Sequence, residues 1–183
     1  MMDVRSLGLD GVVEITPARH ADARGFFCEV YSKTSLEEAG MSFDCVQENM
    51  SYSAQKGVLR GLHYQLPPRA QDKLVRVARG SIFDVAVDIR RESTTFGRWI
   101  SLVVSANAWN QILVPKGFAH GFLTLEDDTE VVYKVTDSYS PSHDRSIRFD
   151  DPQIDIDWPT EGSNIVLSDK DRVAPMLSDA ETF

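Results

Sequence analysis

Five residues in this chain have side chains that could move a proton or steady the charge that it leaves behind: His63, Lys73, His120, Tyr133 and Asp171. The two histidines end unusual segments, a Leu-Arg-Gly-Leu-His run and a Pro-x-Gly-x-x-His run. A lone histidine on a strand is more often structural than catalytic, so neither run is sufficient by itself. An imidazole that titrates near neutral pH, beside an ammonium and a phenol, could remove and return a proton. Together the five residues suggest a proton-transfer site inside a barrel.

The composition of the chain is typical of one well-buried domain. It has 183 residues, of which 42% are hydrophobic, and no apolar run long enough to span a bilayer. We expect a single domain over residues 1–183, with residues 173–183 as a mobile tail. Met1–Asp10 lacks the apolar segment of a signal peptide, which predicts a cytoplasmic location. Cys28 and Cys45 have no disulfide or metal-ligand spacing and are expected to stay reduced.

The charge of the chain limits its partners. A net charge of −9 at pH 7 argues against a nucleic-acid surface, and nothing in the sequence suggests a membrane partner. An acidic protein that binds an anion must gather its arginines locally. Arg24, Arg60 and Arg79 are candidates, because each adjoins a glycine.

Short β-type runs separated by glycine, asparagine or aspartate dominate the chain. We expect strands over residues 11–17, 22–31, 43–53, 59–65, 73–79, 81–89, 99–104, 111–114, 121–125 and 131–136, and a short helix over 35–39. Gln47 and Asn49 share a strand face that could line a cavity or equally meet water. From Ser138 onward the chain favours loops and short helices. This pattern predicts an all-β fold, an antiparallel sandwich or barrel.

Two segments resemble the two-part motif of the cupin superfamily, whose fold is an antiparallel jelly-roll barrel. The first segment contains His63, and the second is Pro115–His120. Metal-binding cupins carry His-x-His and a glutamate in the first part, where this chain has Gln65 and Lys73. A charged lysine has no free lone pair and repels a cation, so we expect no bound metal.

A closer resemblance extends over most of the chain. The segments that are similar to the dTDP-4-dehydrorhamnose 3,5-epimerase family are Asp22–Glu29, Gln47–Ser51, Gly57–Gln65, Lys73–Arg76, Phe83–Arg90, Pro115–Phe122, Tyr139–Pro141 and Leu167–Asp171. Members of this family are metal-free, cofactor-free dimeric cupins of deoxysugar biosynthesis. The resemblance implies a homodimer in which an N-terminal strand, within residues 10–31, joins the neighbour's sheet. An ordinary edge strand would have the same sequence pattern.

Inverting a carbon beside a ketone requires a base, a group that holds the enolate oxygen, and an acid on the opposite face. His63 has the chemistry of the base, and the ammonium of Lys73 suits the enolate oxygen. The resemblance implies that Asp171 fixes the imidazole and that Tyr133 is the opposite acid.

The resemblance also implies a set of substrate contacts. It places Arg24 and Arg60 on the diphosphate of a nucleotide sugar, and it assigns further contacts to Glu29, Gln47, Glu48, Asn49, His120, Asp144 and Lys170. Asp144 stands where the family usually has glutamate, and Lys170 could equally be a surface lysine. Arg60 and His63 have opposite strand parity, so both can line one pocket only if the strand bends or bulges, for which Gly61 is a candidate position.

The expected function is therefore dTDP-4-dehydrorhamnose 3,5-epimerase, which converts dTDP-4-dehydro-6-deoxy-D-glucose into dTDP-4-dehydro-L-rhamnose. The nearest alternative is an epimerase of secondary metabolism that inverts only C3 or only C5. A metal-dependent cupin enzyme and a non-catalytic sugar-nucleotide sensor are two further alternatives from other classes.

Overall fold

The computed structural model describes residues 2–160, 162 and 164–183. Its strands are β1 (Asp3–Ser6), β2 (Val13–Thr16), β3 (Arg19–Asp22), β4 (Gly25–Cys28), β5 (Gln47–Ser53), β6 (Leu59–Gln65), β7 (Lys73–Arg79), β8 (Ser81–Asp88), β9 (Trp99–Ser105), β10 (Gln111–Val114), β11 (Phe118–Thr124), β12 (Thr129–Val135) and β13 (Asp144–Ser146). The helices are α1 (Lys33–Glu38) and α2 (Asp169–Arg172). No helix among the described residues is long and apolar enough to cross a membrane.

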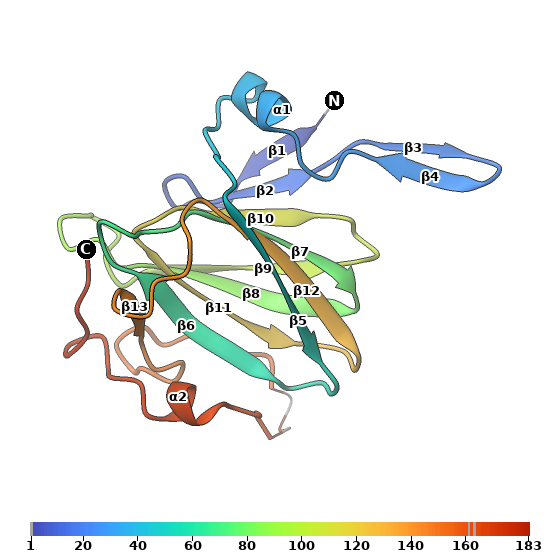
Figure 1. The fold of residues 1–183 in the computed structure, drawn as a ribbon. Helices are drawn as coiled ribbons and strands as arrows, with labels where there is room; N and C mark the ends of the chain where they lie inside the picture. The colour runs from blue at the N-terminus through green and yellow to red at the C-terminus, as the bar shows by residue number, and fades with distance from the viewer. Residues whose placement is uncertain (1, 161, 163) are drawn as a thin grey trace.

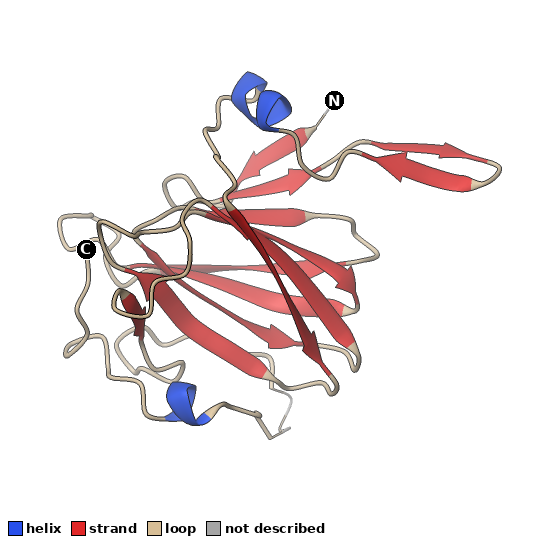
Figure 2. Ribbon diagram, viewed as in Figure 1, coloured by secondary structure: helices blue, strands red, loops and turns tan. Residues whose placement is uncertain are grey.

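The strands form two main antiparallel sheets that face each other (Figure 1). One has the order β1-β2-β10-β7-β12-β5 and the other β13-β6-β11-β8-β9. The β3–β4 hairpin projects away from the barrel, and both short helices lie outside the sheets (Figures 1 and 2). The prediction of an all-β, antiparallel jelly-roll barrel with short peripheral helices is confirmed.

Apolar side chains fill the barrel on one side and leave room for a cavity on the other. Residues that point inward from both sheets form this core: Val75, Val77, Ile112 and Val131 from the first sheet, and Ile82, Ala86, Phe118 and Phe122 from the second. The opposite face of the second sheet is also covered, because Val85 and Val87 pack with Ile154 and Trp158 of the C-terminal segment. Coverage on both faces explains why β8 has apolar residues at both strand parities, with Asp84 between them.

Residues 173–183, where the sequence predicts mobility, lie against this covered face. Leu177 and Ala180 are buried members of its cluster. The backbone amide of Phe183 donates to the carbonyl of Ile89, and the amide of Arg91 donates back to the carbonyl of Phe183. The segment is therefore packed against the barrel, unlike the expected tail. Its few apolar side chains are buried in the core, and its last residue forms backbone hydrogen bonds with the residues that follow β8.

Three element boundaries also differ from the sequence prediction. Helix α1 begins at Lys33, before the expected start, because the Ser32 side chain accepts from the amide of Ser35 and caps the first turn. Strand β5 begins only at Gln47, since Phe43 is buried with Leu36 beneath α1. Strand β11 begins at Phe118, directly after the Pro115–Gly117 turn.

Candidate active site

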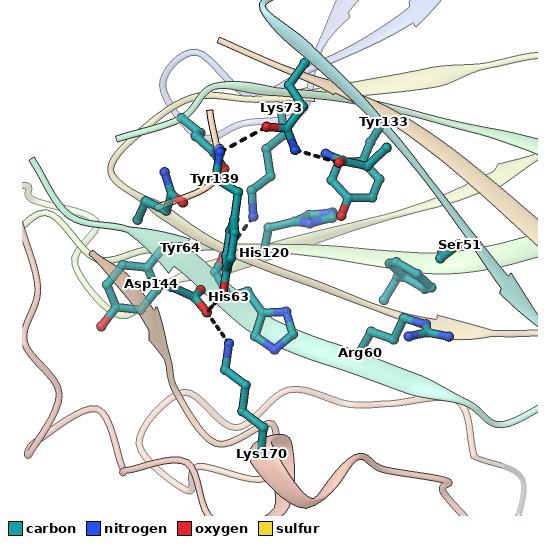
Figure 3. A pocket seen from close by; sticks show the side chains of 15 residues that line it. Ser51, Arg60, His63, Tyr64, Lys73, His120, Tyr133, Tyr139, Asp144 and Lys170 are labelled. Atoms are coloured by element: carbon teal, nitrogen blue, oxygen red, sulfur yellow. Dashed lines mark hydrogen bonds and ion pairs between the residues drawn. The ribbon is translucent and has the colours of Figure 1, made fainter. Parts of the chain in front are cut away.

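A cavity of about 430 Å³ opens between the two sheets. Its lining is mostly polar and comes from both sheets and from the loops above them: Gln47, Asn49, Ser51, Arg60, His63, Tyr64, Gln65, Gln71, Lys73, His120, Phe122, Tyr133, Tyr139, Asp144 and Lys170. Figure 3 shows ten of these side chains by name, with His120 deep between His63 and Tyr133. The structure therefore brings most of the predicted site residues to one place.

Strand alternation determines which side chains of the first sheet reach the cavity. On β5, Gln47, Asn49 and Ser51 share the inward face, so the cavity interpretation of this polar face is the right one. On β12, Tyr133 pairs in register with Asn49 and points into the same space. Lys73, at the start of β7, completes this wall.

A β-bulge on β6 brings Arg60 and His63 to the same cavity. His63 pairs with His120 of β11 while Arg60 pairs with Phe122, so β6 has one residue more than its partner between these pairs. The bulge lies at Gly61, where a Cβ atom would be 2.5 Å from the Cα of Gly121 and φ is +134°. The predicted bulge is confirmed, and close strand contact explains why only glycine fits there.

His63 is joined to an acid from the far end of the chain. Its Nε2 lies 2.5 Å from Oδ1 of Asp171, which is 3% exposed. Burial alone would raise the pKa of Asp171, but the hydrogen bonds from His63 and Ser168 hold that pKa below its usual value. Because the carboxylate is ionised, neutral His63 carries its proton on Nε2 and keeps the lone pair on Nδ1. The ring thus has the tautomer and partner that a general base needs.

Lys73 is a buried cation in the same cavity. Its side chain is 9% exposed, and its Nζ donates to the backbone carbonyl of His63 over 3.0 Å. Desolvation lowers the pKa of Lys73 to about 8, although Asp84 and Asp144 act in the opposite direction. At neutral pH the ammonium is therefore still charged. Its attraction for a neighbouring oxygen increases as negative charge develops on that oxygen.

Tyr133 faces His63 from the other sheet. Its partly buried phenol has a raised pKa, chiefly because burial disfavours the phenolate. It is therefore a phenol at neutral pH, with a proton to give. His63 and Tyr133 stand on opposite walls because β6 and β12 belong to different sheets.

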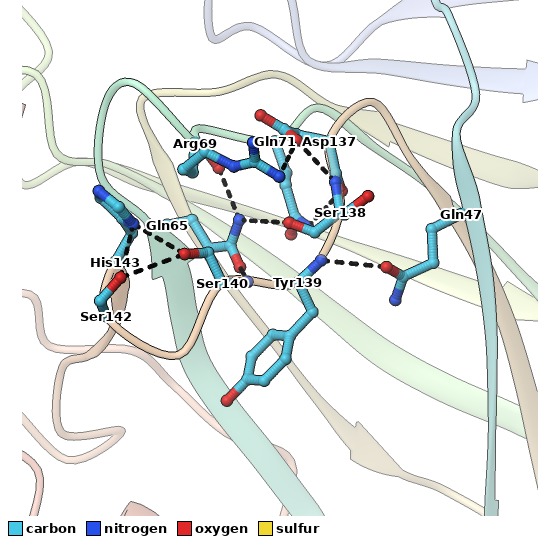
Figure 4. Close-up of polar contacts among 10 residues, drawn as sticks. All are labelled: Gln47, Gln65, Arg69, Gln71, Asp137, Ser138, Tyr139, Ser140, Ser142 and His143. Carbon is cyan, nitrogen blue, oxygen red and sulfur yellow. Dashed lines mark hydrogen bonds and ion pairs between the residues drawn. The ribbon is translucent and has the colours of Figure 1, made fainter.

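Gln65 occupies the position where metal-binding cupins have a second histidine, and here it holds a loop. Its Oε1 accepts from the amide of Ser140 over 2.7 Å, and its Nε2 donates to the carbonyls of Arg69 and Ser138 over 2.6 Å and 3.3 Å (Figure 4). We call Asp137–Ser140 the strap. Gln47 Oε1 accepts from the amide of Tyr139 over 3.0 Å and attaches the strap to β5. No group of three or more His, Cys, Asp or Glu side chains suited to a metal ion occurs in the described part of the chain.

Asp144 links the strap to helix α2. It accepts from the hydroxyl of Tyr139 over 3.2 Å and from Nζ of Lys170 over 2.5 Å. The shorter carboxylate that replaces the expected glutamate therefore still reaches the rim of the cavity. Lys170 also lines the cavity, at its rim, with a side chain that is 51% exposed.

Three predicted substrate-binding residues do not line the cavity of their own chain. Arg24 lies at the turn of the projecting β3–β4 hairpin and pairs with Asp22. Glu29 follows that hairpin and accepts from the hydroxyl of Ser35. Glu48 has the outward parity of β5 and forms an ion pair with Lys134.

Several lining residues were not predicted to be part of the site. Ser51 has the parity of Gln47 and Asn49, so strand alternation could have identified it. Gln71 and Tyr139 lie in loops, where no periodicity indicates direction, and only the family-like segment Tyr139–Pro141 pointed to Tyr139. Phe122 shares the inward face of β11 with His120, so strand alternation could have identified it as well.

The comparisons with known proteins agree with this geometry. Residues 6–179 match a family model described as dTDP-4-dehydrorhamnose 3,5-epimerase. A protein of that name from Sinorhizobium fredii is 48% identical to the chain, over 96% of this chain and 90% of that protein. The crystal structure of a dTDP-6-deoxy-D-glucose-3,5-epimerase from Legionella pneumophila, in complex with dTDP-4-keto-L-rhamnose, has a TM-score of 0.92 and 45% identity, covering 97% of this chain and 94% of that one.

A less similar structure bears on how many carbons are inverted. It is a 3'-monoepimerase from Streptomyces bikiniensis in complex with dTDP-quinovose, with a TM-score of 0.87, 35% identity, and coverage of 94% of this chain and 86% of that one. The relative named for two centres thus shares more of the sequence than the one named for a single centre. By its sequence, its fold and its cavity, this chain belongs to the dTDP-4-dehydrorhamnose 3,5-epimerase family.

Proposed function

We propose that the chain is an isomerase that converts dTDP-4-dehydro-6-deoxy-D-glucose into dTDP-4-dehydro-L-rhamnose by inverting C3 and C5. The observation that carries this proposal is the placement of three groups around one cavity. His63 lies on one sheet and is paired with Asp171 of α2, the phenol of Tyr133 lies on the other sheet, and the ammonium of Lys73 lies in the same cavity. Such an arrangement supplies a base, an opposing acid and a cation for the enolate.

The proton path follows from the tautomer of His63. Nδ1 takes the proton from the carbon next to the C4 ketone, and the electron pair moves to the ketone oxygen, which becomes an enolate. Lys73 stabilises that oxygen, and Asp171 stabilises the imidazolium that forms. Tyr133 then gives its proton to the opposite face of the carbon. Exchange with solvent restores the phenol and the neutral imidazole before the second carbon reacts.

The polar lining supports a nucleotide-sugar substrate. Arg60 is the natural ligand for the diphosphate, because its buried Nε atom has no hydrogen-bond partner among the described residues. Gln47 and Asn49 offer uncharged amide groups to the substrate, and the ring of His120 can donate or accept a hydrogen bond. Because a diphosphate does not cross a membrane unaided, we also propose a cytoplasmic location.

We further propose a homodimer in which the N-terminal hairpin reaches the neighbouring chain. Phe26 and Phe27 on the hairpin are 51% and 70% exposed, which is unusual for large apolar side chains in a monomer. The same hairpin carries Arg24 away from its own cavity. An arginine from the neighbour would add a second cation for the diphosphate, which the family resemblance assigns to Arg24.

A mixing experiment tests this exchange. Arg24→Ala and His63→Ala chains should each be nearly inactive, but hybrids formed by unfolding and refolding them together contain one site with both residues intact. If the hairpin serves the neighbour, the mixture regains about a quarter of wild-type activity. A mixture that stays as inactive as its components would contradict the exchange.

The reaction itself is tested with the dTDP-keto sugar in deuterated water. Inversion at both carbons predicts deuterium at C3 and at C5 of the product, detected by NMR. The similarity to the S. bikiniensis structure suggests a second candidate function, that of a 3'-monoepimerase. An enzyme of that kind would introduce deuterium at one carbon only. His63→Ala should lower turnover at least about a hundredfold, as expected for a lost general base, whereas a non-catalytic sensor would be unaffected.

A further inference from the structure

Asp84 is a buried acid directly behind the cavity, and the mechanism above gives it no role. It lies on β8, has 0% exposure and is not part of the cavity lining. Both carboxylate oxygens lie within hydrogen-bond distance of Nε2 of His120, at 3.0 Å and 2.9 Å. A buried carboxyl group must be paired, so the contact with His120 requires an explanation.

The contact fixes the state of a ring that lines the cavity. When Asp84 is ionised and His120 is neutral, the proton of the imidazole is on Nε2 and the lone pair is on Nδ1. His120 then presents to the substrate an acceptor for a sugar hydroxyl. A second histidine–acid pair thus lies next to the His63–Asp171 pair, since His120 and His63 are paired residues of adjacent strands.

Asp84 also acts on Lys73. Burial raises the pKa of Asp84 above its usual value, and the charge and hydrogen bond of His120 and the charge of Lys73 offset this rise only in part. In turn, Asp84 is the largest influence that raises the pKa of Lys73 against desolvation. Removing this one carboxylate would leave a desolvated ammonium with weaker compensation.

We propose that Asp84 is a positioning residue for the epimerase: it orients His120 through Nε2, and its buried negative charge keeps Lys73 protonated where the enolate forms. This proposal depends on the role assigned to Lys73 above. The carboxylate does not touch the cavity, so it acts through the two side chains that do.

Other charged groups also surround Lys73 and must be considered. They come from every neighbouring element: His63 (β6), His120 (β11), Tyr133 (β12), Asp144 (β13) and Lys170 (α2). Asp144 is itself paired with Lys170, so its charge is partly neutralised. Within the described part of the chain, the side-chain contact of Asp84 is with His120, and Lys73 is the cation whose charge lowers its pKa.

Two substitutions separate the two parts of the proposal. Asp84→Asn removes the charge but keeps an oxygen that can accept from Nε2, whereas Asp84→Ala removes both. Asp88→Asn is the matched control, because Asp88 lies on the same strand with 0% exposure and accepts from Arg90, Ser93 and Thr95 instead. Thermal unfolding of each variant establishes that it is folded.

The first measurement needs no activity. In protein labelled with ¹³C at lysine Cε, the Lys73 signal is identified by its absence in a Lys73→Met sample and followed with pH. We expect its midpoint to fall by about one pH unit in Asp84→Asn and to stay unchanged in Asp88→Asn. Equal midpoints in wild type and Asp84→Asn would overturn the proposal, whatever the activities.

The second measurement is the pH profile of kcat with the dTDP-keto sugar. Since only protonated Lys73 can hold the enolate, Asp84→Asn should lose about tenfold more activity than wild type on going from pH 6.5 to pH 9, as a one-unit shift requires. Asp84→Ala should in addition raise KM, because His120 loses its anchor. If the Lys73 signal shifts and the pH profile of kcat does not, Asp84 does keep Lys73 protonated, but turnover does not depend on that proton. The role assigned to Lys73 is then wrong, and the proposal fails with it.

Discussion

Replacing Lys73 by methionine should make the folded chain more stable at neutral pH while it abolishes turnover. The side chain is 9% exposed and lies in a cavity whose desolvation disfavours its charge. Methionine has a similar length and no charge to desolvate. Turnover should fall by roughly two to three orders of magnitude, because the enolate loses the cation that stabilises it.

The size and the sign of the stability change follow from linkage. The pKa of Lys73 is lowered from 10.5 to about 8 in the folded state. Between these values the unfolded chain binds more protons than the folded chain, so wild-type stability rises with pH across this window. Below pH 8 the penalty is fully present and is about 3 kcal/mol, at about 1.4 kcal/mol per pKa unit. The advantage of Lys73→Met should therefore shrink by roughly 2 kcal/mol between pH 7 and pH 10.

Urea unfolding at pH 7 and pH 10 measures this change. Comparing the two pH values cancels the pH-independent costs of the substitution, including the lost hydrogen bond to the carbonyl of His63. All samples are compared at one protein concentration, because association contributes to apparent stability. Lys116→Met is the control, since Lys116 is exposed. Stability differences that stay parallel at the two pH values would refute the argument that Lys73 pays a desolvation penalty.

Three further predictions concern the same cavity. Asp171→Asn should lower kcat about 10- to 100-fold, because a hydrogen bond to a charged group is worth about 1.5–3 kcal/mol. The control Asp169→Asn, on the same helix but exposed, should keep a kcat near that of wild type. Equal effects of the two substitutions would argue against a role for the pair of His63 and Asp171. Tyr133→Phe should leave proton abstraction intact but remove the opposite acid, so NMR in deuterated water should show exchange at the substrate carbons with little inversion. Gln65→Met should release the strap, raising KM at least several-fold with a smaller change in kcat; a fall in kcat alone would contradict the positioning of the rim by Gln65.

Strand alternation predicted which side chains share a strand face, but not whether that face meets a cavity or water. Gln47 and Asn49 were recognised as one face of a strand, and that face lines the cavity. An irregularity near Gly61 was also predictable, because Arg60 and His63 could share a pocket only through a bend or a bulge, and the structure shows the bulge. These inferences concern neighbours along one strand, where a period of two residues carries the information.

Contacts between residues that are far apart in the sequence could not be predicted from local sequence patterns. Asp171 meets His63 across 108 positions, and only the family resemblance indicated that pair. Asp84 had no signal either, because an acid inside a continuous apolar run has no periodicity that points to its partner. The packing of the final residues was missed for a similar reason, since Leu177 meets its neighbours only after the sheet has formed.

The cavity shows how a fixed ammonium can take the place that a metal ion has in related barrels. Lys73 stands where metal-binding cupins have an acidic ligand. Gln65 stands where they have a second histidine, and Gln65 holds the strap instead. A covalently attached cation cannot dissociate, but it carries a desolvation penalty that lowers its pKa to about 8. Asp84 offsets part of that penalty from behind the wall. Stability, the charge of Lys73 and turnover should therefore change together with pH, because all three depend on the protonation of one buried ammonium.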